Sequence, residues 1–127
     1  HVSAFWDVMP TIAAITGAEA PSAIDGTSFL PALQGENQEP GEPLYWEYHA
    51  FGGMQGVRMG DWKGVRLEIR RQDDAPLQLF NLAIDEDETT DVADQHPEIV
   101  REIRAIMDSR QTSEIESWNF ARNAKYQ

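Results

Sequence analysis

The 127-residue sequence contains no cysteine. This absence excludes disulfide bonds, thiolate zinc sites and a cysteine nucleophile, although it does not identify a cellular compartment. The chain also lacks a continuous run of the roughly twenty apolar residues that a membrane-spanning helix needs, so we expect no membrane among its partners.

Positive charge is scarce as well. Ten Lys and Arg residues stand against 22 Asp and Glu residues, which gives a formal net charge of −12. Because such a field repels polyanions, we expect no nucleic acid among the partners. The balance does not identify a substrate, since a basic pocket is compatible with an acidic surface.

The chain begins at His1 rather than Met, and no segment typical of a signal peptide follows. We therefore expect it to be a piece of a longer protein. Its length suits one domain with a real core.

The N-terminal residues show helical periodicity. The apolar positions that recur at three- and four-residue steps are Phe5, Val8, Met9, Ile12 and Ile15. Pro10 suits the first turn of a helix that begins near Asp7, and Gly17 suits its end. This stripe is more apolar than a surface helix requires, so we expect it to have packed on a missing part of the parent protein. In the isolated chain we expect self-association, or folding back of the helix, to hide the stripe.

Four strand-like runs follow, joined by short links. They span residues 44–49, 55–59, 62–69 and 77–82. The links are too short for parallel crossovers, which predicts antiparallel neighbours. In the third run, alternation predicts that Val65, Leu67 and Ile69 share one face while Trp62 and Arg66 take the other.

A second helix is predicted over Pro97–Thr112, where Ile99, Ile103 and Met107 belong to one apolar stripe. The fold class that follows is α+β, a small antiparallel sheet of about four strands covered by a C-terminal helix, with an additional N-terminal helix. We divide the chain into an N-terminal helix and loop (1–42), the sheet and its helix (43–112), and an irregular tail (113–127).

Short motifs follow one another along the chain in a specific order. They are Asp7–Thr11, Asp25–Gly35, Tyr45–Glu47, Val57–Lys63, Leu79–Leu82, Asp85–Glu88 and His96–Glu98. In this order they resemble the C-terminal end of the arylsulfatase family, which is part of the alkaline-phosphatase-like superfamily. Each motif alone is weak, but the series at short spacing is specific, and it covers the chain up to about Asp108.

The resemblance implies a parent enzyme that cleaves sulfate esters. Family members use a formylglycine, made from a Cys or Ser in a Cys/Ser-x-Pro-x-Arg motif, and a calcium ion held by Asp and Asn. This sequence contains no such motif, and Pro21-Ser22-Ala23 has the wrong order. We therefore expect no catalytic residue, no metal site and no cofactor in this chain, which alone should be inactive.

His49, Gln55 and Arg58 flank the loop formed by residues 50–54. The resemblance makes them candidate substrate-binding residues at the rim of the pocket, where Arg58 would attract a sulfated small molecule or glycan. The alternative is an ordinary polar hairpin face on which Arg58 pairs with Glu47.

Two further features have competing interpretations. Trp46 and Trp62 are either platforms for sugar rings or core anchors under the C-terminal helix, and the latter role is expected for at least one of them. The acidic segment from Asp85 to Asp91 superficially resembles a calcium loop. It lacks the central Gly and the spaced Glu of an EF-hand, so we expect solvated charge.

The function implied is that of a C-terminal fragment of a sulfatase-like hydrolase, which completes the fold and shapes the substrate entrance. Its partner would be the missing N-terminal catalytic domain. Alternatives are the C-terminal part of a related phosphodiesterase or phosphoglycerol transferase, and a stand-alone binding or interaction module. Family analogy implies a periplasmic or secreted parent.

Overall fold

The computed structural model describes residues 1–72, 74–110 and 120. The chain forms two compact units, residues 1–44 and residues 45–127, and each is described by itself. Within the described residues, no helix combines the length and the apolar character that crossing a membrane would require.

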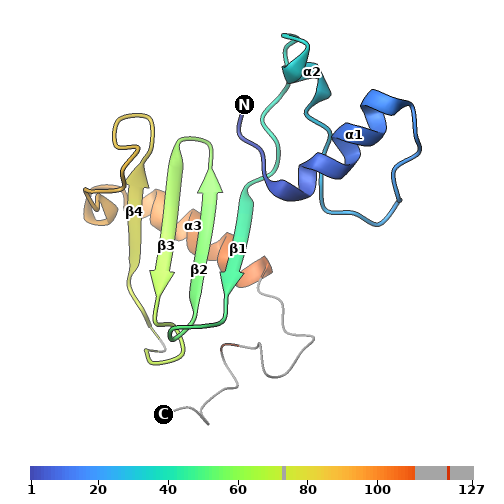
Figure 1. The fold of residues 1–127 in the computed structure, drawn as a ribbon. Coiled ribbons are helices and arrows are strands. Elements are labelled where there is room, and N and C mark those ends of the chain that lie inside the picture. The colour runs from blue at the N-terminus through green and yellow to red at the C-terminus, as the bar shows by residue number, and fades with distance from the viewer. Residues whose placement is uncertain (73, 111–119, 121–127) are drawn as a thin grey trace. The chain divides into compact units, whose positions relative to one another are not determined.

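The N-terminal unit contains a 3-10 turn, η1 (Phe5–Asp7), followed directly by α1 (Val8–Thr16) and, after a long loop, by the short helix α2 (Leu30–Leu33) (Figure 1). Pro10 lies in the first turn of α1, as predicted. The helix ends at Gly17, whose φ of 71° is left-handed and favours glycine.

The buried residues of η1 and α1 are Asp7, Pro10 and Thr11, and not the apolar stripe. Asp7 accepts hydrogen bonds from the backbone amides of Ala4 (2.7 Å) and Thr27 (2.9 Å). The hydroxyl of Thr11 donates to the carbonyl of Asp7 (2.7 Å) and accepts from the amide of Phe29 (3.0 Å). These bonds hold residues 27–29 against the helix.

The close packing of this loop on the helix explains why residue 26 is a glycine. A Cβ at Gly26 would lie 2.1 Å from the carbonyl oxygen of Trp6, which no side chain tolerates. The apolar stripe faces outward instead, with Phe5 90% exposed and Ile12 54% exposed. Within the described residues of the N-terminal unit, nothing therefore covers the stripe.

The second unit is built on a four-stranded antiparallel sheet in the order β1-β2-β3-β4 (Figure 1). The strands are β1 (Leu44–Tyr48), β2 (Met54–Met59), β3 (Trp62–Leu67) and β4 (Leu77–Asn81). Gly60, with a φ of 57°, makes the tight turn that pairs Met59 with Trp62. A 3-10 turn, η2 (Ala93–Gln95), precedes the helix α3 (Pro97–Arg110).

Helix α3 lies across one face of the sheet (Figure 1), which confirms the α+β architecture. The core between them consists of Val57, Leu77, Leu79, Ile103 and Met107. The final two residues predicted for this helix, and the predicted tail apart from Phe120, lie outside the described residues.

The third strand is shorter than predicted. It ends at Leu67, because Glu68 adopts a φ of 54° and turns the chain. Leu67 is 43% exposed on the face away from α3, whereas Ile69 is buried in a separate cluster with Ala75 and Phe120. The prediction that Ile69 continues the strand alternation was wrong.

The acidic segment is also more structured than solvated charge. Asp85 accepts hydrogen bonds from the backbone amides of Thr89 (3.0 Å) and Thr90 (2.9 Å), and these bonds lower its pKa. Asp91 accepts a bond from the amide of Leu79 (3.0 Å), at the outer edge of β4. Through these hydrogen bonds the two carboxylates organise the loop that follows β4.

We expect Gly64→Ala to lower the free energy of unfolding by about 1–3 kcal/mol. A Cβ at this position would lie 2.6 Å from Cγ2 of Ile103, so the sheet and α3 would have to separate. Gly41→Ala is the matched control, because nothing lies within 4 Å of a Cβ there. Urea unfolding measures both variants, and equal stability of the two would contradict this close approach.

Candidate functional site

A chain of polar side chains crosses the α3 side of the sheet. The hydroxyl of Tyr45 donates to Glu47 Oε1 (2.5 Å) and accepts from Gln55 Nε2 (2.9 Å). Arg66 Nη1 in turn donates to Gln55 Oε1 (3.3 Å). Gln55 is only 3% exposed, and satisfying its amide with partners on two other strands removes the cost of burying it.

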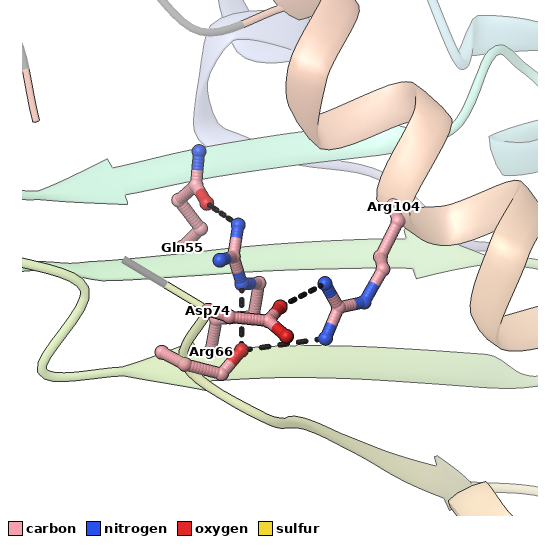
Figure 2. A network of polar contacts seen from close by, with 5 residues as sticks. Gln55, Arg66, Asp74 and Arg104 are labelled. Carbon is pink, nitrogen blue, oxygen red and sulfur yellow. Dashed lines mark hydrogen bonds and ion pairs between the residues drawn. The ribbon is translucent and has the colours of Figure 1, made fainter. Parts of the chain in front are cut away.

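The network continues to α3 through the backbone (Figure 2). Arg66 Nε and Arg104 Nη2 both donate to the carbonyl oxygen of Ala75, at 3.2 and 3.4 Å. Arg104 Nη1 also binds Asp74 Oδ1 at 3.1 Å. Two guanidinium groups from different elements thus converge on one carbonyl oxygen.

Burial and neighbouring charge shift two pKa values in this network. Burial, followed by the hydrogen bond to Glu47, raises the pKa of Tyr45 far above its usual value of 10.0, so the phenol stays protonated and remains a donor. Burial, followed by the nearby Arg104 guanidinium, lowers the pKa of Arg66. The carboxylates of Asp108 and Asp74 act on the pKa of Arg66 in the opposite direction, so the charge of the arginine pair is partly compensated.

The structure brings together two of the three predicted site residues. His49 Nε2 lies 3.3 Å from Glu47 Oε2, and its ring stacks on Phe120 with centroids 4.7 Å apart. His49 and Gln55 thus belong to one network, joined through Tyr45 and Glu47.

Arg58 lies apart from them, on the opposite face of the sheet. In the register of β2 and β3 it stands opposite Lys63. Its Nε donates to the carbonyl oxygen of Gly60 (2.8 Å). The alternative pairing with Glu47 is not what the contacts show, because Glu47 lies on the α3 side and binds Tyr45 and His49.

The sequence interpretation missed Tyr45, Arg66 and Arg104. One signal was available, because Tyr45 and Glu47 have the same parity in β1 and share a face. No local pattern indicates that Arg66 meets Arg104, since the two belong to a strand and a helix that pack only in the folded chain.

The two tryptophans of the sheet take different places. Trp62 packs against the core under α3, and its ring contacts His96 with centroids 4.7 Å apart. It is the expected core anchor. Trp46 is 41% exposed on the open face, the face away from α3, where Tyr48 is 51% exposed.

Tyr45→Phe should lower the free energy of unfolding by about 1–3 kcal/mol near neutral pH, because Glu47 and Gln55 both lose a half-buried partner. The raised pKa of Tyr45 also predicts a pH dependence. Its contribution is fully present below the unfolded value of 10.0 and is lost as the pH rises through the higher folded value, because the unfolded chain ionises first.

Urea unfolding of the wild type and Tyr45→Phe across neutral and alkaline pH tests both effects. Tyr48→Phe, on the open face, is the matched control. If the free energy of unfolding changed equally with alkaline pH in the wild type and in Tyr45→Phe, the assigned role of the phenol would be contradicted.

Comparison with known proteins adds sequence relatives, although no protein-family model matches the chain. The chain is 32% identical over 117 residues to an arylsulfatase K of Xenopus laevis and 26% identical over 110 residues to an arylsulfatase K of Danio rerio. These alignments include 80% and 81% of this chain but only 22% and 21% of the relatives. The chain therefore spans about a fifth of the length of the curated relatives that it matches.

Several solved structures contain the same fold. Ps i-CgsB, crystallised with k-i-k-neocarrahexaose, is 27% identical with a TM-score of 0.66, over 93% of this chain and 25% of that one. BT1596, a 2-O GAG sulfatase, is 23% identical with a TM-score of 0.67, over 81% and 23%. A phosphonate monoester hydrolase of Agrobacterium radiobacter is 22% identical with a TM-score of 0.56, over 81% and 23%, and shows a likeness of fold alone.

Both of these relatives are named as arylsulfatases, and the fold described above is also found in solved structures such as Ps i-CgsB and the sulfatase BT1596. In sequence and fold the chain is therefore similar to a C-terminal subdomain of the arylsulfatase family, within the alkaline-phosphatase-like superfamily.

Proposed function

We propose that this chain is the C-terminal part of a hydrolase of sulfate esters, and that it completes the fold and forms part of the substrate entrance. The observation that carries the proposal is the match of 80% of this chain to about a fifth of an arylsulfatase. The nucleophile and the metal would then lie in the preceding catalytic domain.

The residues of this chain do not fit the two groups that such a parent would use. The sequence has no Cys/Ser-x-Pro-x-Arg motif to supply a formylglycine. The described residues contain no cluster of carboxylates and imidazoles suited to calcium. The chain would therefore contribute to the fold of the parent and to substrate binding.

Two uncovered apolar surfaces support the proposed catalytic domain as a partner. One is the helix stripe, which we define as Phe5, Met9, Ile12 and Ile15, each more than half exposed. The other is the open face, where Trp46, Tyr48 and Leu67 are each at least 41% exposed. Exposed apolar patches of this kind mark interfaces, and a preceding domain would bury both.

At the substrate entrance we propose His49 and the loop after it. The loop projects Phe51, which is 80% exposed and stacks on Tyr48 with centroids 6.3 Å apart. Gln55 is too buried to touch a substrate, so its role would be to hold Tyr45 and, through Glu47, His49. Arg58 would act from the open face.

A related phosphonate or phosphodiester hydrolase is the second candidate, because the phosphonate monoester hydrolase of Agrobacterium radiobacter has the same fold. The two sequence relatives favour sulfate esters. Export of the parent to the periplasm or outside the cell is proposed from the family resemblance alone.

The activity test uses the parent protein encoded by the complete gene. We expect it to hydrolyse 4-nitrophenyl sulfate faster than 4-nitrophenyl phenylphosphonate, while the 127-residue chain alone hydrolyses neither, because it lacks the nucleophile motif. Release of 4-nitrophenol measures both reactions. Faster turnover of the phosphonate would support the second candidate, and turnover by the chain alone would overturn the proposal.

The helix stripe predicts self-association of the isolated chain. We expect Ile12→Glu to weaken this association at least tenfold, because a carboxylate would enter the apolar contact. Ile84→Glu is the matched control, since Ile84 is 86% exposed but lies in a loop outside both apolar surfaces. Analytical ultracentrifugation measures the association, and equal effects of the two substitutions would show that the stripe is not the contact.

A further inference from the structure

A groove beside α3 has two arginines among its lining residues. It has a volume of about 560 Å³, and its apolar lining consists of Pro76, Leu77, Ala93, Pro97 and Val100. Arg101 and Arg104 line it as well, and Arg66 meets Arg104 at the carbonyl of Ala75. Three of the ten basic residues of an acidic chain thus gather at one place.

The two arginines of the lining are matched by two carboxylates, but these described residues form only one ion pair with one another. The carboxylates that line the groove are Asp74 and Asp94. Asp74 pairs with Arg104 at 3.1 Å, but its side chain is 91% exposed, and an exposed ion pair contributes little free energy. Among the described residues, no ion pair engages the exposed Arg101.

The geometry suits an oxoanion. A guanidinium presents several N–H donors in a planar fork that matches the oxygens of sulfate or carboxylate groups. In Figure 2 the Asp74 carboxylate lies beside the Arg104 guanidinium, with Arg66 nearby. Asp74 thereby marks where an incoming anion would lie, and its exposure makes it easy to displace.

We propose that this groove binds a sulfate group carried on a saccharide, as an anchoring site outside the reactive centre. The arginines bind the sulfate, and the proline and aliphatic lining contacts the apolar face of the sugar ring. The volume lies within the range of pockets that hold small ligands. The choice of a sulfated sugar rests on the proposed function, whereas the anion site rests on the arginines alone.

The test is a titration of the 127-residue chain with N-acetylglucosamine 6-sulfate, with side-chain Nε–Hε signals of the arginines followed by NMR. N-acetylglucosamine and sodium chloride at matched ionic strength are the reference titrants. We expect saturable shifts with the sulfated sugar only, at Arg66, Arg101 and Arg104. Shifts that are equal for chloride would overturn the site.

Three substitutions sharpen the test. Arg101→Gln should raise the Kd about fivefold, because a charge-assisted contact is lost. Arg110→Gln, which makes the same charge change on α3 outside the groove, should leave the Kd unchanged. Asp74→Asn should lower the Kd about threefold, because a competing carboxylate disappears.

Each outcome is decisive. Equal effects of Arg101→Gln and Arg110→Gln would reduce the binding to general charge attraction and overturn the site. Weaker or unchanged binding in Asp74→Asn would show that Asp74 does not occupy the position of the ligand. Binding of a glutamate-rich peptide in place of the sugar would overturn the saccharide as occupant. A parent without sulfatase activity would overturn the proposed function and leave this titration unaffected.

Discussion

The packing of α3 against one face of the sheet is the constraint on which the second unit depends. At its centre Gly64 lets Ile103 approach the backbone of β3 more closely than any side chain would permit. Val57, Leu79 and Met107 are fully buried around this point. The closeness of the two layers determines which side chains can lie between them.

Polar groups that are buried under α3 need hydrogen-bond partners, whereas apolar groups do not. Gln55 is buried there and Tyr45 is half-buried, and the hydrogen bond between them joins two strands. The network extends through Arg66 to the carbonyl of Ala75, which Arg104 of α3 shares. Helix, sheet and loop are therefore held together by hydrogen bonds as well as by the core, and two guanidinium groups converge where they meet.

In the described part of the chain, the other face of the sheet and the stripe of α1 both expose large apolar side chains. A two-layer unit buries one face of its sheet, and Trp46 and Leu67 remain on the other. The helix of the N-terminal unit is also covered on one side only. Its hydrogen bonds to the loop are made by Asp7 and Thr11, and the apolar stripe stays exposed. This organisation is the one expected of a piece that matches about a fifth of its relatives' length.

The sequence by itself determined the types and order of the elements, the turn at Gly60 and the family resemblance, because these follow from periodicity, short links and local motifs. It also indicated that one tryptophan would be a core anchor. Only the tertiary structure decided that Gln55 is buried under α3 and is linked there to His49 through Tyr45 and Glu47. Alternation relates neighbours within a strand, but the partner across strands and the face that a helix covers depend on contacts between residues far apart in the chain. For the same reason, the meeting of Arg66 with Arg104 could be found only once α3 was packed on the sheet.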